Sequence, residues 1–79
     1  MKYTTYLVHF PDGGTQEVDY PVPVGPPLDV NARPLPLPLS SPRVLAYRVS
    51  RRSQEELRSE IIVHITLEQL FPDELGEYL

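Results

Sequence analysis

The chain has 79 residues, of which 41% are hydrophobic and none is cysteine, and its formal net charge is −4. This length allows one small β domain over residues 1–79, and the missing cysteine excludes disulfides, thiolate zinc sites and cysteine nucleophiles. No apolar stretch approaches the roughly 18 residues of a membrane span. The first residues lack the apolar run of a signal peptide, so we expect a cytoplasmic protein without membrane contact.

The charges are segregated along the chain. Residues 1–32 carry one lysine and four acids (−3), residues 33–58 six arginines and two glutamates (+4), and residues 59–79 five acids (−5). We favour a solvated surface whose charges pair within the fold over a dedicated basic patch. The excess of arginine over lysine and the ten prolines fit a thermophilic source.

A β-hairpin is predicted at the start of the chain. Residues 2–10 and 15–20 are rich in tyrosine, threonine and valine and alternate polar with apolar side chains, as strands do. Residues 11–14 between them read Pro-Asp-Gly-Gly, the chemistry of a tight turn in which Gly13 takes a positive φ.

Loop length decides the register of this hairpin. A three-residue loop pairs Phe10 with Gly14 and Tyr6 with Val18, which puts the apolar residues of both strands on one face. A four-residue loop would set the same side chains opposite acids, because a one-residue slip swaps the faces. We therefore predict the three-residue loop.

The middle of the chain is rich in proline. Residues 21–27 hold four prolines and one glycine, and they predict a crossing connection. Residues 33–39 alternate proline with leucine, so in a strand the prolines would line one edge and the leucines would share one face. We predict a protected edge strand or a packed extended loop here; the alternative is a polyproline helix offered to a partner.

Residues 43–49 and 60–65 predict two further strands. The charged segment between them is either a hairpin tip or a helical turn over residues 53–59. A Thr-Leu-Glu-Gln capping box then predicts a helical turn over residues 67–70. A second short helix is expected to begin at Pro72, where proline suits the first helical position.

These elements predict a mainly β fold. Five to six short antiparallel strands would form a small, partly open barrel, similar in architecture to an SH3-like barrel, with a short C-terminal helical tail. The resemblance rests on strand count and turn spacing alone. The alternative is an α+β fold with a helix at residues 53–59. The predicted core contains Val8, Val18, Tyr47, Val63 and Ile65.

No pattern in the sequence makes a catalytic, cofactor or metal site. His9 and His64 lie in predicted strands and could meet if those strands are neighbours, but two imidazoles without a third ligand do not make a metal site. No serine lies in a nucleophile elbow, and the two adjacent glycines belong to the turn rather than to a phosphate-binding loop. We therefore expect a protein that is not an enzyme and needs no cofactor.

Two classes of function remain. The first is a protein-interaction or accessory module that self-associates, with a candidate surface in the tail, unless that tail packs on its own fold: Leu70, Phe71, Leu75 and Tyr78. The second is a small nucleic-acid-binding barrel with an arginine-rich hairpin: Arg43, Arg48, Arg51, Arg52 and Arg58. The acidic pI of about 4.9 weighs against the second class.

The placing of the isoleucines predicts a homodimer. Ile61 and Ile65 would lie on one face of their strand and Ile62 on the other, and Leu7 extends the second face in the first strand. A small sheet has one core face, so the other face needs a cover of its own. Since the tail is short, we expect a second copy of the chain to supply that cover.

Overall fold

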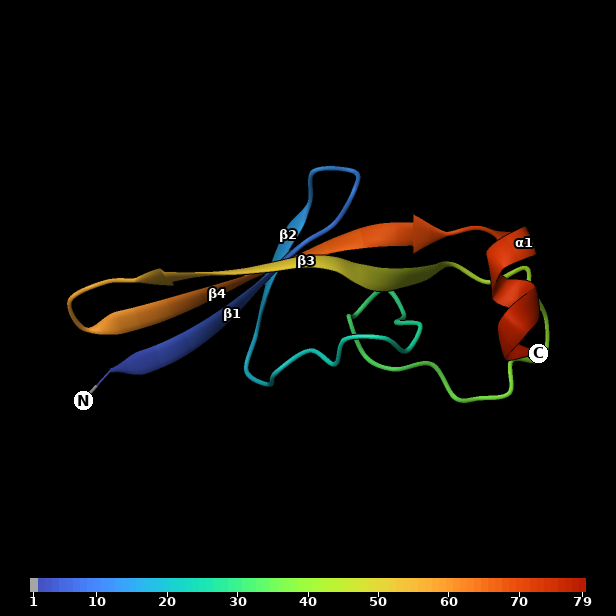
Figure 1. The fold of residues 1–79 in the computed structure, drawn as a ribbon, viewed down its shortest axis with the longest axis horizontal. Helices are drawn as coiled ribbons and strands as arrows, with labels where there is room; N and C mark the ends of the chain where they lie inside the picture. Colours follow the sequence, from blue (N-terminus) through green and yellow to red (C-terminus); the bar gives the residue numbers. More distant parts are fainter. Residues whose placement is uncertain (1) are drawn as a thin grey trace.

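The computed structural model describes residues 2–79 and contains one open, mixed, four-stranded sheet (Figure 1). The strands are β1 (Tyr3–His9), β2 (Thr15–Val18), β3 (Ala46–Glu56) and β4 (Glu60–Leu70). A single-turn helix, α1 (Pro72–Leu75), and a 3-10 turn, η1 (Gly76–Tyr78), follow the last strand. The order across the sheet is β2-β1-β4-β3, and the molecule is elongated, 45 × 22 × 15 Å.

The first hairpin has the predicted register. Tyr6 lies opposite Val18, and the Phe10 N–H donates to the Gly14 carbonyl across 2.8 Å. Gly13 has a φ of +95°, which closes the loop as predicted. Turn chemistry and side-chain alternation are both local, so they could be interpreted without knowledge of the rest of the fold.

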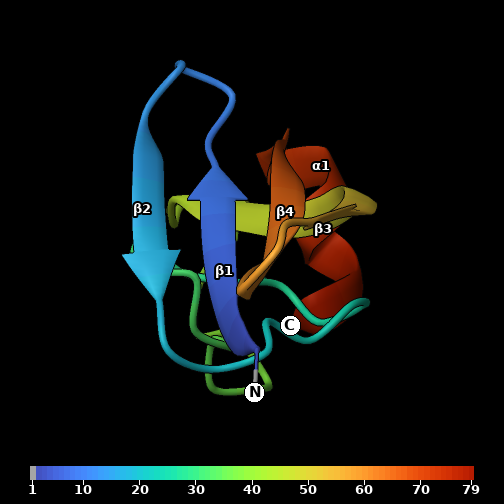
Figure 2. The same cartoon turned by 90° about the vertical axis from the view of Figure 1, so that its left-hand side faces the viewer.

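The antiparallel, SH3-like barrel of five to six strands is not what the structure shows. β1 and β4 are parallel, with Tyr6 opposite Val63, and the sheet stays open with β2 and β3 as its two edges (Figure 2). The described residues 19–45 contribute only isolated bridges, at Leu28 and Pro34, in place of a strand. With four strands instead of six, the sheet has too little width to close on itself.

The edge strand expected at residues 33–39 is wrong, and the packed loop expected as its alternative is confirmed. Its leucines do not share a face, since Leu39 is buried in a core cluster, Leu35 packs partly against the same cluster, and Leu37 is 52% exposed. An irregular segment lets two leucines reach the core, which a regular strand along a sheet edge would not allow.

Neither of the two helical turns expected within residues 53–70 forms, and β3 and β4 occupy most of that range. β3 continues to Glu56, and the Leu57 N–H donates to the Glu60 carbonyl across 2.7 Å, so the hairpin-tip alternative is confirmed and the helix at residues 53–59 is wrong. The helical turn at residues 67–70 is wrong as well. Leu67 and Leu70 are buried in different core clusters on opposite sides of β4, and this burial outweighs the local capping pattern. The helix that begins at Pro72 is confirmed.

The core consists of two clusters. The larger one packs Val8, Val18, Val63, Ile65 and Leu67 of the sheet under three residues of the proline-rich connection, Val22, Leu28 and Ala32. Tyr47, the fifth predicted core residue, is half-buried against this cluster. The smaller cluster lies at the α1 end and joins Leu39, Ala46, Leu70 and Leu75. The first part of the connection, up to Ala32, thus covers one side of the sheet, and α1 together with Leu39 covers the other side only at the end of β4.

Candidate protein-interaction surface

Within residues 2–79, one side of the sheet has no second layer over most of its length. We call this side the open face, and its residues on β1 and β4 are Thr5, Leu7, His9, Ile62 and His64. Leu7 lies opposite His64 and Thr5 opposite Ile62, so these side chains are neighbours on the same side of the sheet. Leu7 and Ile62 are half-buried by their neighbours within the sheet, and neither belongs to a core cluster.

The two histidines meet on the open face, as they would if their strands were neighbours. His9 Nε2 lies 2.9 Å from His64 Nδ1, with ring centroids 5.2 Å apart and a small angle of 25° between the rings. That separation is what two imidazoles give when the facing nitrogens point straight at each other. One nitrogen therefore donates and the other accepts. His64 Nε2 faces Glu55 Oε1 at 3.4 Å, so the contact runs on to β3.

A metal site does not follow from this pair. A chelated metal ion needs two lone pairs that converge on it, whereas the two facing nitrogens of this pair are hydrogen-bonded to each other. Among residues 2–79, no group of three or more histidine or acidic side chains is placed to hold a metal ion.

Thr5, the remaining polar residue of the open face on these two strands, is also partnered. Thr5 Oγ1 donates to Glu60 Oε2 across 2.7 Å. Because burial is costly chiefly for polar groups without a partner, a face whose polar side chains are already hydrogen-bonded can be covered at a lower cost. Glu55 and the Thr5–Glu60 pair could not be linked to this face from sequence, since they depend on which strands become neighbours.

The tail residues proposed as an interaction surface have divided roles. Leu70 and Leu75 are buried in the smaller core cluster, and Tyr78 packs partly against it. Only Phe71 presents a large apolar surface, with 54% of it exposed. The tail therefore packs mainly on its own fold.

The five arginines of the nucleic-acid hypothesis do not form one patch. Arg43 precedes β3 and Arg58 follows it, so they lie at opposite ends of an 11-residue strand. Arg51 and Arg52 point to opposite sides of the sheet. Arg48 hydrogen-bonds Glu68 through Nε (3.0 Å) and Nη2 (2.5 Å). That hydrogen bond, with the attraction of the carboxylate, raises the pKa of Arg48, whose charge is thus already partnered.

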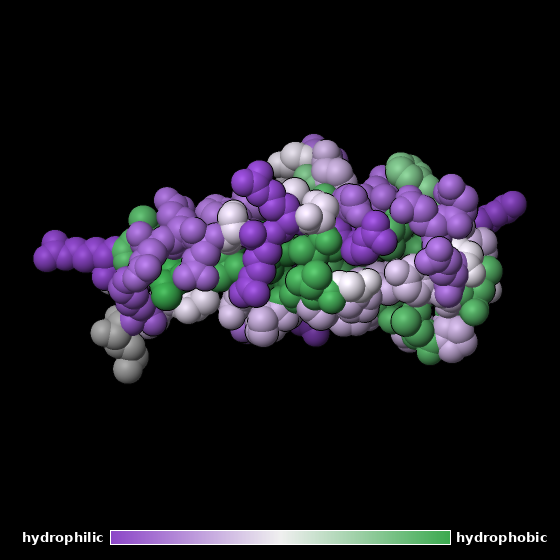
Figure 3. Space-filling model, viewed as in Figure 1, coloured by the Kyte–Doolittle hydropathy of each residue, from purple (hydrophilic) through white to green (hydrophobic). Residues whose placement is uncertain are grey.

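Hydrophobic side chains are exposed elsewhere as well (Figure 3). A shallow depression of about 320 Å³ lies beside the first hairpin, lined in part by Phe10, Val30, Leu45 and Tyr47. Phe10 and Tyr47 pack edge to face with their centroids 5.2 Å apart. Val30 and Leu45 are about half-exposed at its rim. Sequence periodicity could not reveal this depression, because Val30 and Leu45 come from irregular segments.

The structure defines a small protein with an open mixed sheet that is layered on one side. The chain belongs to the family described as "Uncharacterised Treponema protein", whose model matches residues 2–78. No curated protein and no solved structure gives a significant match. None of the helices within residues 2–79 has the length and apolar character to cross a membrane.

Proposed function

We propose that the protein is a non-catalytic interaction module that associates with a second copy of itself through the open face. The observation that carries this proposal is the position of Leu7 and Ile62. They are diagonal neighbours on the two central strands, on the side opposite the core, and residues 2–79 place no second layer over them. Covering apolar sheet surface on both sides is what small sheets require for stability.

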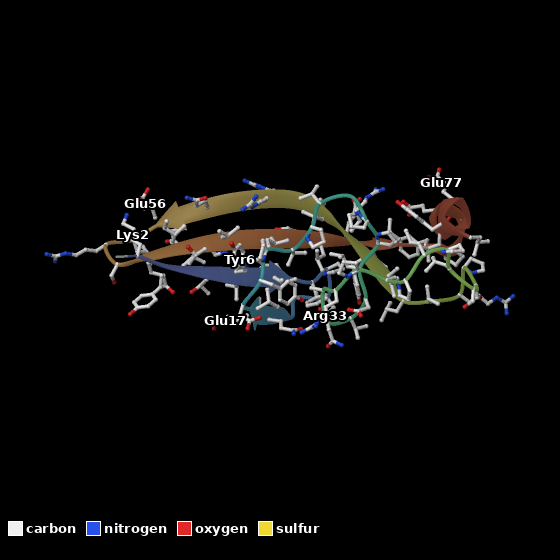
Figure 4. The ribbon with its side chains drawn as sticks, turned by 90° about the horizontal axis from the view of Figure 1, so that it is seen from below. Lys2, Tyr6, Glu17, Arg33, Glu56 and Glu77 are labelled. Carbon is white, nitrogen blue, oxygen red and sulfur yellow. The ribbon has the colours of Figure 1, made fainter. Side chains whose placement is uncertain are left out.

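The length of the face suits such an interface. A stable protein–protein contact buries roughly 800 Å² on each partner, and the sheet lies along the 45 Å length of the molecule, with the connection on its other side (Figure 4). A second copy is the favoured occupant because a two-fold contact sets the same patch against itself. Of the acidic groups on this side of the sheet, Glu55 and Glu60 are partnered by His64 and Thr5 within one chain, whereas Glu17 of β2 lies opposite Leu7 and is exposed.

Sedimentation equilibrium at micromolar concentration tests the proposal. We expect Leu7→Glu to lower the average mass to about half that of the unmodified chain, because a carboxylate buried without a partner opposes association. The matched control is Leu37→Glu, which makes the same chemical change at a residue of the connection that is 52% exposed. It should leave the mass unchanged, and circular dichroism should show both variants folded.

A 9.0 kDa monomer at every concentration for the unmodified chain would contradict self-association. If the unmodified chain instead bound immobilised RNA at low salt, with steep loss on adding salt, the arginine-rich hairpin would become the functional surface. The separation of Arg43 from Arg58 and the pairing of Arg48 with Glu68 count against that alternative.

A further inference from the structure

The outer edge of β3 is free along half of its length. At its beginning, Tyr47 exchanges backbone hydrogen bonds of 2.8 Å and 2.6 Å with Leu28, which occupies the outer side there. Beyond the bulge at Ser50, no bridge to β3 from the described residues lies outside the sheet. Figure 4 shows this free half running to the end where Lys2 and Glu56 lie.

Backbone groups on this free half point outward at every second residue. The Leu57 N–H donates to Glu60 of β4, so residues 51, 53, 55 and 57 direct their backbone groups into the sheet. By alternation, the N–H and C=O of Arg52, Gln54 and Glu56 are directed outward to solvent. Three residues with free donors and acceptors are enough to pair with another strand.

The side chains of this edge carry charge in two halves. The sequence Arg51-Arg52-Ser53-Gln54-Glu55-Glu56 is positive at its start and negative at its end. Charges of one sign would protect an edge strand from pairing. Charges divided in this way repel a parallel copy and attract an antiparallel one, because each positive half then faces a negative half.

We propose that β3 pairs antiparallel with β3 of a second copy, about a two-fold axis at Gln54. The regular segment between the bulge and the hairpin turn is residues 51–57, and its middle residue is Gln54. Pairing centred there sets Gln54 opposite itself and Arg52 opposite Glu56 of the second copy, twice. Every outward backbone group of the three residues then has a partner.

This contact is separate from the one in the proposed function and compatible with it. Arg52 and Glu56 point to the side of the sheet that carries the core, since Arg52 lies beside Ile65 and Glu56 beside Ile61. Lys2, which forms an ion pair with Glu56, lies on that side too. Edge pairing therefore leaves the open face unobstructed and joins two such faces into a larger one. With both contacts, four chains assemble where the two two-fold axes cross at right angles.

A cysteine at the axis tests the geometry directly, because the chain has no cysteine of its own. Directly opposite residues that exchange hydrogen bonds have Cα atoms about 5.5 Å apart, within the range that a disulfide spans. Gln54→Cys should therefore form a covalent dimer on mild oxidation. Arg58→Cys, in the adjacent hairpin turn, is the control and should stay largely uncrosslinked. Equal crosslinking of the two variants would overturn the proposal.

Exchange of the charges at residues 52 and 56 provides a second test of the edge contact. In the Leu7→Glu background, where only the edge contact remains, Arg52→Glu should halve the average mass and the added Glu56→Arg should restore it. Lys2→Gln controls for the ion pair that Glu56→Arg removes, and should keep the mass. No rescue by the double exchange would overturn the edge contact. An unchanged mass in Leu7→Glu itself would instead contradict the open-face contact, so the two failures are distinguishable.

Discussion

Ile65 and Ile62 lie three residues apart on β4 and differ only in the side of the sheet on which they stand. Ile65 is 2% exposed beneath the proline-rich connection, whereas Ile62 is half-buried on the open face and outside both core clusters. The residue type and the strand are the same, so the layer above each side chain makes the difference. In a chain of this size one connection can cover one side of a sheet, and within residues 2–79 the other side has no second layer over most of its length.

Matched alanine substitutions measure this difference. Ile65→Ala should lower the free energy of unfolding by about 2–5 kcal/mol, through lost burial and the cavity that remains. Ile62→Ala should cost less, roughly 1–2 kcal/mol in dilute solution, because its side chain is partly exposed and belongs to neither core cluster. Urea denaturation at low protein concentration gives both values. Equal losses would show that the open face is covered within a single chain.

The turn between β1 and β2 decides which side chains face the core, and Gly13 can be used to test it. Gly13→Ala should lower the free energy of unfolding by about 1–2 kcal/mol, because an L-residue at φ near +95° carries backbone strain. No atom lies within 4 Å of the added Cβ, so steric contact does not contribute. The control is Gly76→Ala, at φ −56° and equally open, which should leave the denaturant midpoint nearly unchanged. Similar midpoints for the two variants would contradict the turn geometry.

The smallest effect is expected at Glu56, which lies on the covered side of the sheet but outside the core clusters. The hydrogen bond from Lys2, and then the attraction of its charge, lower the pKa of Glu56 below the ordinary 4.5. A depressed pKa means that this ion pair stabilises the fold above pH 4.5 and that its contribution is lost as the pH falls through the lowered value. Both side chains are well exposed, so screening keeps the gain small. NMR titration should show the pKa of Glu56 rising in Lys2→Gln; an unchanged value would exclude the pair.

The candidate surface was only partly predictable. That a second apolar side would need a cover followed from the alternation of Leu7 and Ile62 in the sequence. The contact between His9 and His64 depended on β1 and β4 becoming neighbours. The contact of His64 with Glu55 depended in addition on β3 lying beside β4. The free edge of β3 was hidden by the expectation of more strands, because a barrel would have left no such edge.

Local chemistry in the sequence alone determined the first hairpin and its register and the helix that begins at Pro72, and it left residues 53–59 open between a hairpin tip and a helical turn. The hairpin and the helix each depend on residues within a few positions of one another, where turn geometry and side-chain alternation act directly. Tertiary structure decided the parallel pairing of β1 with β4, the irregular path of residues 33–39 and the strand conformation of residues 67–70. In these segments leucine burial in two separate clusters outweighed local propensity, and the partners that receive those leucines are distant in the chain.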